Sequence, residues 1–177
     1  MRRFLSLVTV LLLATGSLAA QSSVWLGGGP TFPMSSYGDY AKTGWMASAG
    51  FGLGLGSSGR LGLQFEGLYG SNSHETEGDK TTLYGGMANL AYQLGNTAKL
   101  HPYVFGGGGL LVHKFGTDDD AYDGESDSKF AYQFGGGLDI PLKSIGLWID
   151  IRYLSRAEDN ATAVVPIMAG IYIPLGK

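Results

Sequence analysis

The sequence predicts an all-β protein: an eight-stranded, antiparallel, up-and-down transmembrane β-barrel. Two observations predict it. Eight segments alternate between apolar positions and polar or glycine positions, and the connections between these segments are short and long in strict turn. A barrel that crosses a membrane has short turns on one side and longer loops on the other, so the alternation of connection lengths is what this fold requires.

The chain begins with the features of a secretory leader. Arg2 and Arg3 precede an apolar run at residues 4–15, and small residues follow up to Ala20. The run is too short to span a bilayer as a helix and is typical of a signal peptide. We therefore expect residues 1–20 to be a signal peptide, cut after Ala19 or Ala20, and residues 21–177 to form the barrel domain.

The expected strands cover residues 22–32, 43–55, 60–70, 81–94, 100–113, 129–140, 145–155 and 163–175. Each is long enough to cross a bilayer when tilted, which takes about 9–11 residues. The seventh strand shows the clearest alternation. Ile149 and Ile151 lie on its apolar face, whereas Trp148, Asp150 and Arg152 lie on the opposite face. This period of two indicates a strand with two different faces. The second, third and sixth strands repeat it, but the pattern leaves the faces of the fifth strand undecided.

The connections and the aromatic residues predict how the barrel sits in the membrane. Brief connections follow the second, fourth and sixth strands, at residues 56–59, 95–99 and 141–144, and longer polar ones lie at about 33–42, 71–80, 114–128 and 156–162. With the long loops facing outward, both termini are periplasmic. We expect aromatic belts at both edges of the apolar band. The outer belt contains Trp45, Tyr69, Tyr84, Tyr132 and Tyr153, and the inner belt contains Tyr92 and Tyr103.

The composition excludes several classes of function. The chain has no cysteine, so it has no disulfide framework, thiolate metal site or cysteine nucleophile. No basic patch is present that could bind nucleic acid. Glycine is common, with 30 residues in 177, and it suits a narrow barrel in which backbones crowd together. Because 44% of the residues are hydrophobic, we expect a folded chain rather than a disordered one.

The non-apolar faces of the strands predict the contents of the barrel interior. They carry Gln64, Glu66, Met87, Asn89, Gln133, Asp139, Trp148, Asp150 and Arg152. Eight strands leave an interior just wide enough for side chains to fill, and buried charges need partners. We therefore expect Arg152 to pair with Glu66 or Asp150, the former across the lumen. We interpret this set as a structural plug, with a proton or ion path as the alternative.

The connection at residues 114–129 is strongly acidic. It contains Asp118, Asp119, Asp120, Asp123, Glu125 and Asp127. Clustered carboxylates suit Ca²⁺, but the spacing is not that of an EF-hand loop. With Gly124 at the sixth position, Ala121 and Phe130 occupy positions at which a side chain should bind the metal. We interpret the segment as a solvated acidic loop, with weak divalent-cation binding as the alternative, and predict no defined metal site.

Residues that could support catalysis do not form a recognisable set. The histidines are His74, His101 and His113, and Ser71, Ser73, His74 and Glu75 lie together in the second long connection. A nucleophile and its base need fixed geometry, which neighbours in a polar loop seldom have. We predict no catalytic residue and no cofactor-binding residue.

Two short motifs carry no function in this context. Gly54, Gly56 and Gly59 have the spacing of a dinucleotide fingerprint, but they precede a strand rather than a helix and so predict a turn. Residues 160–162 spell a glycosylation sequon, which is uninformative for a barrel of the outer-membrane type that the strands predict.

The whole mature chain resembles the small outer-membrane β-barrel family, the group of the OmpA transmembrane domain and OmpX. The resemblance rests on residues 24–29, 101–109, 134–138 and 164–171. The most specific part of this resemblance is the stretch 102–109, in which Pro-Tyr-Val-Phe is followed by four glycines. The resemblance implies that the outer-membrane assembly machinery is a partner during insertion, although this sequence finishes on Lys177 rather than on the usual aromatic residue.

Together these observations predict a non-enzymatic bacterial outer-membrane protein with a plugged polar lumen. Its acidic loops would serve an envelope-structural or surface-contact role. The alternatives are a narrow channel or a binder of a small hydrophobic ligand, a soluble lipocalin-like barrel, and a lipid-modifying enzyme similar to outer-membrane deacylases and palmitoyl transferases. We expect a monomer that contacts membrane lipid and binds neither a cofactor nor nucleic acid.

Overall fold

The computed structural model describes residues 22–56, 58–95, 99–116, 126–159 and 161–175. The expectations for the leader, for the carboxylates at 118–125 and for Asn160 lie outside these residues. The described part contains eight strands and one short 3₁₀ helix. They are β1 (Ser22–Met34), η2 (Ser35–Asp39), β2 (Gly44–Leu55), β3 (Leu61–Ser73), β4 (Lys80–Gln93), β5 (His101–Gly116), β6 (Ser126–Pro141), β7 (Gly146–Arg156) and β8 (Ala163–Pro174).

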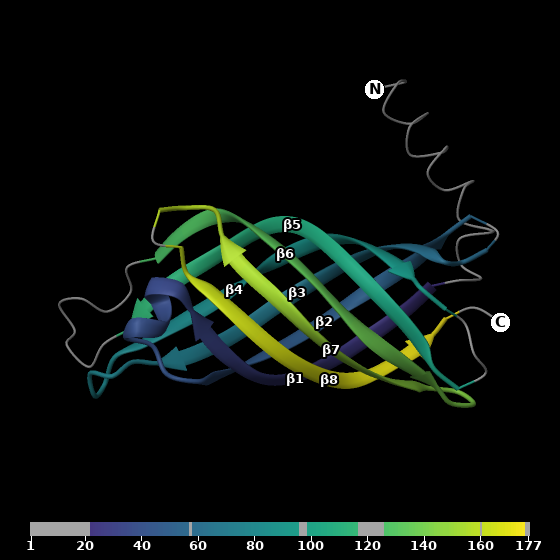
Figure 1. Ribbon diagram of the computed structural model, residues 1–177, viewed down its shortest axis with the longest axis horizontal. Coiled ribbons are helices and arrows are strands. Elements are labelled where there is room, and N and C mark those ends of the chain that lie inside the picture. The colour runs from purple at the N-terminus through teal and green to yellow at the C-terminus, as the bar shows by residue number, and fades with distance from the viewer. Residues whose placement is uncertain (1–21, 57, 96–98, 117–125, 160, 176–177) are drawn as a thin grey trace, which may run out of the picture.

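The strands close into a single barrel in chain order, and β8 pairs with β1 (Figure 1). All neighbouring strands are antiparallel. We call the end at which β1 begins and β8 ends the turn end, because the short connections also lie there. The opposite end, which carries η2 and the longer connections, is the loop end. The predicted eight-stranded, up-and-down barrel is confirmed.

Each expected strand is present, and several continue further toward the loop end than the apolar pattern indicated. β5 reaches Gly116 and β6 begins at Ser126, so both extend into the segment that we interpreted as a loop. The backbone pairing continues without a break to Lys114 opposite Ser126. Polar residues can therefore extend a strand wherever the partner backbone is still within reach.

The two faces of the wall match the predicted alternation. On β7, Ile151 is 54% exposed on the outside, whereas Arg152 is 4% exposed inside the barrel. The inward residues predicted from the sequence are confirmed. They are Gln64, Glu66, Met87, Asn89, Gln133, Asp139, Trp148, Asp150 and Arg152.

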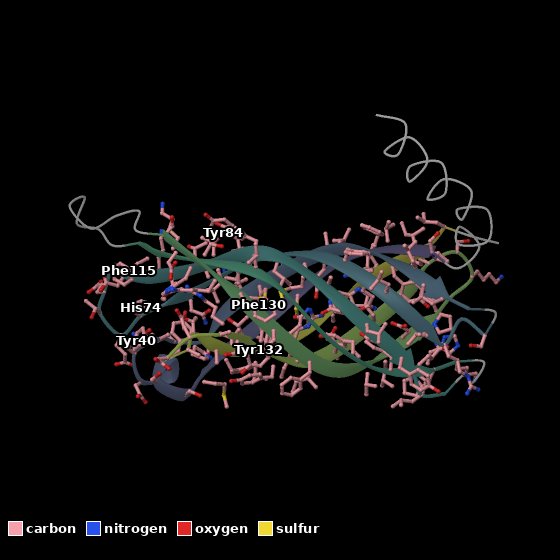
Figure 2. The ribbon with its side chains drawn as sticks, turned by 90° about the horizontal axis from the view of Figure 1, so that it is seen from above. Tyr40, His74, Tyr84, Phe115, Phe130 and Tyr132 are labelled. Atoms are coloured by element: carbon pink, nitrogen blue, oxygen red, sulfur yellow. The ribbon has the colours of Figure 1, made fainter. Side chains whose placement is uncertain are left out.

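The expected outer aromatic belt is present on the outward face near the loop end. Ring centroids of Trp45 and Tyr69 lie 5.7 Å apart, and those of Tyr69 and Tyr84 lie 6.5 Å apart. Tyr132 and Tyr153 make a second pair at 6.3 Å. Figure 2 labels Tyr84 and Tyr132 of this belt. Aromatic rings at this height suit a membrane–water interface.

The expected inner belt is half wrong. Tyr92 is 45% exposed on the outside, as predicted, but Tyr103 points into the barrel and lines its interior. The reason is the register of β5. Tyr92 pairs with Val104, so Val104 shares its outward face and Tyr103 takes the opposite one.

Glycine serves a clear turn function between β2 and β3. Gly56 has a φ of 72° and Gly59 a φ of 61°, which are conformations that residues with a side chain rarely adopt. The glycine-rich motif is therefore a turn, as predicted.

At the loop end, η2 folds over the barrel mouth and buries Tyr37, which is 1% exposed. Among the described residues, no helix has the length and apolar character needed to cross a membrane.

Candidate functional site

The middle of the lumen contains an ion-pair network centred on Arg152. Its Nη1 donates to Glu66 Oε2 at 2.9 Å, and its Nη2 donates to Asp150 Oδ2 at 2.6 Å. A further bond joins Nε to Asp150 Oδ1 at 3.0 Å. All three side chains are at least 96% buried. Both predicted pairings are therefore present together, and one guanidinium neutralises charge on two carboxylates.

Two amides complete this network and connect it to further strands. Asn89 Nδ2 donates to Glu66 Oε1 at 2.9 Å, and Gln133 Nε2 donates to Asn89 Oδ1 at 2.9 Å and also to Glu66 Oε1. The participants come from β3, β4, β6 and β7. Because β3 and β7 are not neighbours in the wall, the Glu66–Arg152 pair crosses the lumen. We call these five residues the lumen network.

Two aromatic residues of β5 support the lumen network from the turn-end side. The Arg152 guanidinium lies over the Phe105 ring, 4.9 Å from its centroid, which is a cation–π contact. Tyr103 donates its hydroxyl to Asp150 Oδ2 at 3.4 Å. Sequence reasoning missed both, because the glycines at 106–109 interrupt the alternation that would have set the inward face of β5.

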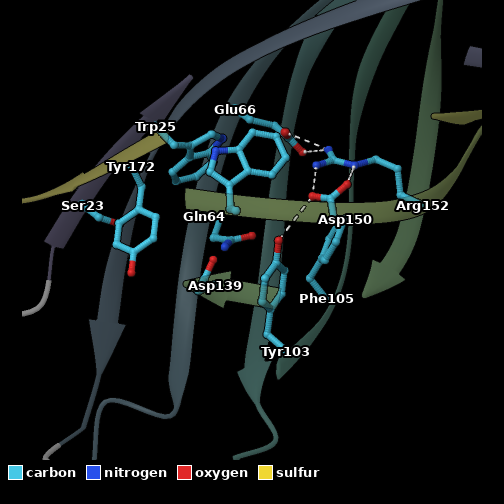
Figure 3. A pocket seen from close by; sticks show the side chains of 11 residues that line it. Ser23, Trp25, Gln64, Glu66, Tyr103, Phe105, Asp139, Asp150, Arg152 and Tyr172 are labelled. Carbon is cyan, nitrogen blue, oxygen red and sulfur yellow. Dashed lines mark hydrogen bonds and ion pairs between the residues drawn. The ribbon is translucent and has the colours of Figure 1, made fainter. Parts of the chain in front are cut away.

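A cavity of about 110 Å³ lies between the lumen network and the turn end (Figure 3). We call it the turn-end cavity. Five of its lining residues are aromatic, three are acidic and one is an arginine. The lining comprises Ser23, Trp25, Gln64, Glu66, Tyr103, Phe105, Asp139, Trp148, Asp150, Arg152 and Tyr172. Two of these carboxylates and the arginine belong to the lumen network. The third carboxylate, Asp139, lies outside it.

The loop end has a separate polar cluster around Thr81. His74 Nε2 lies 2.7 Å and His113 Nε2 lies 3.1 Å from the Thr81 hydroxyl. His74 is also flanked by the rings of Tyr40 and Phe115, with centroids 5.2 Å and 5.4 Å away (Figure 2). Burial lowers the pKa of His74 below its ordinary value. We interpreted His74 as part of a polar loop, but it is 6% exposed and held by an isolated β-bridge with Ala41.

The serines near His74 do not form a catalytic set with it. Ser73 is exposed and Ser71 partly so, whereas the alternating residues Asn72 and His74 are buried. Serine and histidine side chains therefore lie on opposite faces of the wall. The third histidine, His101, begins β5 at the turn end. In the described ranges no three His, Cys, Asp or Glu side chains gather in a way that could hold a metal ion.

We expected Arg156 to begin a polar connection, but it lies inside the barrel at the loop end. It is the last residue of β7 and is 1% exposed. Its Nη2 donates to Asp127 Oδ2 at 2.9 Å, and its Nε lies 3.3 Å from Glu158. Nearby, Asn72 donates to Thr31 at 3.0 Å and to the carbonyl of Lys42 at 2.9 Å. The charged groups described in the loop half of the lumen are thus paired, whereas the buried hydroxyls of Tyr37 and Ser48 have no hydrogen-bond partner among the described residues.

Comparison with known proteins gives a family and a fold. Residues 5–164 match the family model described as the outer membrane protein beta-barrel domain. No curated protein sequence matches the chain significantly.

Two solved barrels share the fold at low sequence identity. Neisserial surface protein A has a TM-score of 0.69 at 15% identity, with 87% of this chain and 97% of that chain covered. Ail, the attachment invasion locus protein of Yersinia pestis, has a TM-score of 0.51 at 16% identity, with 86% and 99% covered. That Ail structure was solved with the heparin analogue sucrose octasulfate.

Proposed function

Because this chain belongs to the outer membrane protein β-barrel domain family, we propose that it is a non-enzymatic barrel with a closed lumen that acts through its outer loops. The protein is an integral component of the bacterial outer membrane, and its outward apolar face contacts lipid. The lumen network supports the proposal of a closed lumen, because it joins four strands across the barrel.

We further propose how the chain reaches the membrane and how it is oriented there. Residues 1–20 are a leader removed on export, and the assembly machinery of the outer membrane inserts the remaining chain as a monomer. The loop end faces outward and both termini are periplasmic. The loop-end aromatic belt supports this orientation, because β5 and β6 continue past it into polar residues such as Asp127 and Lys129.

Ion conductance tests the closed lumen. The purified protein reconstituted in a planar bilayer should show no stable conductance steps, because Arg152 and its partners fill the lumen. Arg152→Ala combined with Glu66→Ala is the matched positive control, since it removes the pair that crosses the barrel. Stable conductance of the unmodified protein would show a narrow channel, which is the competing function.

The loop end supports a role in surface contact with a cationic partner. Asp39, Glu75 and Glu77 are exposed there. This acidic end is the wrong charge for a sulfated polyanion of the kind present in the Ail structure. Charged residues at an exposed rim act mainly by steering a partner of opposite charge.

A charge-neutralised variant tests this contact. Asp39→Asn, Glu75→Gln and Glu77→Gln together should reduce adhesion of bacteria displaying the protein to amine-coated surfaces. Lys143→Gln, in a turn at the opposite end, serves as the control and should leave adhesion unchanged. Equal adhesion of the neutralised and unmodified proteins would contradict the surface-contact role and leave an envelope-structural one.

A further inference from the structure

The turn-end cavity has a carboxylate without a partner. Glu66 and Asp150 share Arg152, and Asp150 also accepts from Tyr103. Asp139 makes neither a hydrogen bond nor an ion pair with any residue that the structure describes. Figure 3 accordingly shows dashed lines at Asp150 and none at Asp139. With three acidic side chains and one guanidinium along its lining, the cavity contains more acidic than basic groups.

Aromatic rings form most of the remaining wall of this cavity. They belong to Trp25, Tyr103, Phe105, Trp148 and Tyr172. The indole N–H of Trp148 already donates to the carbonyl of Ile171 at 3.3 Å, so this residue has no further hydrogen bond to donate. Arg152 over Phe105 shows that a cation can already rest on a ring face in this lumen. Aromatic faces attract cations through the negative charge of their π-systems.

Glycines in the barrel wall make room for the turn-end cavity. A Cβ atom at Gly27 would collide with the Trp148 ring, one at Gly50 would lie 2.5 Å from a carbon of the Trp25 ring, and one at Gly146 would collide with the Tyr172 ring. The two indoles and the phenol therefore lie close against bare backbone instead of projecting toward the barrel axis. The centre of the turn half stays open, whereas side chains occupy the same region at the level of the lumen network.

We propose that the turn-end cavity binds a small organic cation whose ammonium group pairs with Asp139 and rests against the aromatic rings. A carboxylate inside a barrel is costly to leave ionised without a partner, and an ammonium group removes that cost. The volume of about 110 Å³ accepts a compact head group such as a methylated ammonium. This inference is independent of the loops and holds whether or not they contact a surface.

Choline and its uncharged isostere 3,3-dimethyl-1-butanol are the probes that test the site. The full mature protein in detergent micelles is titrated with each, and binding is followed by tryptophan fluorescence and calorimetry. Choline should quench the fluorescence of Trp25 and Trp148 saturably, and the alcohol should bind at least tenfold more weakly. Asp139→Asn, which preserves shape, should weaken choline binding at least tenfold as well.

Matched controls separate this result from general effects. Glu75→Gln makes the same carboxylate-to-amide change at the loop end and should leave choline binding unchanged. Heat-modifiable gel migration verifies that Asp139→Asn is folded. Equal binding of choline and the alcohol, unchanged choline binding in Asp139→Asn, or absence of saturable binding would each overturn the proposal. Displacement of choline by an equal concentration of potassium chloride would also overturn it in favour of an inorganic-cation site.

Discussion

The two halves of the barrel interior differ in whether their buried charged groups have partners. In the middle and toward the loop end, each buried charge has a partner, as Arg152 does in Glu66 and Asp150 and Arg156 does in Asp127. Toward the turn end, aromatic rings lie against glycines and leave a cavity in which Asp139 has no ion-pair partner among the residues that the structure describes. Both halves are polar inside.

The contrast shows that a polar lumen does not by itself make a barrel either a plug or a pore. What differs is whether the charged side chains pair with one another. A fully paired network holds the strands in place and excludes water, whereas an unpaired group beside a cavity keeps the capacity to bind something else. The loop half is therefore the structural part of the lumen, and the turn half is the part available to a ligand.

Removing Arg152 should have the largest effect on stability. Arg152→Ala leaves Glu66 and Asp150 buried without their cation, and breaking a buried pair in this way costs about 3–5 kcal/mol. Urea unfolding in lipid vesicles measures the loss. The triple variant Arg152→Met, Glu66→Gln, Asp150→Asn removes all three charges and should recover most of that stability. A loss in Arg152→Ala below about 1 kcal/mol would mean that the network is solvated.

Gly27→Ala should be the next most disruptive change. The added methyl group would meet both the Trp148 ring and the carbonyl of Ala169, and overpacking of this kind costs about 1–3 kcal/mol. Gly52→Ala is the control, because a Cβ at Gly52 makes ordinary contacts at 3.4 Å or more. Similar unfolding curves for the two variants would show that the Trp148 ring is not confined against the wall.

Thr81→Val should have a smaller effect, confined to the loop end. The change removes the hydroxyl that His74 and His113 share and should cost about 1 kcal/mol, the net value of an intramolecular hydrogen bond. NMR in detergent micelles should show chemical-shift changes at both histidine rings. Unchanged His113 signals would indicate that this ring has a different partner.

Acidification should have the smallest effect, and His74 should contribute to it. Burial lowers the pKa of His74 in the folded protein below its unfolded value of about 6.5. The unfolded chain therefore binds a proton first, so stability is complete above about pH 6.5 and falls as the pH decreases toward the folded pKa. Unfolding at pH 7.5 and pH 5.5 should show a smaller pH dependence in His74→Gln than in the unmodified protein.

The sequence was sufficient for the parts of the structure that follow from a period of two. Alternation in β7 and β3 placed Arg152, Asp150 and Glu66 inside, and the narrow lumen then made their pairing unavoidable. The same reasoning failed for Tyr103, because four consecutive glycines in β5 have no side chains to reveal which face is inward.

Other parts of the site depend on contacts that no local pattern encodes. Thr81 meets His113 from the next strand, and both histidines lie where polarity alone indicates a loop or a strand end. The turn-end cavity depends on how Trp25 and Trp148 lie over glycines of the wall. Such ring orientations follow from close packing in three dimensions, which is why the sequence indicated a uniformly filled lumen.

Chemical accessibility of single cysteines tests the contrast between the two halves most directly, because the natural chain has no cysteine. Ser23 lines the turn-end cavity, whereas Ser48 is 5% exposed in the packed part of the lumen. A water-soluble cationic thiol reagent should modify Ser23→Cys rapidly and Ser48→Cys at least a hundredfold more slowly in folded protein, and both equally after unfolding. Equal rates in the folded state would mean that water fills the lumen from end to end, which contradicts a closed barrel.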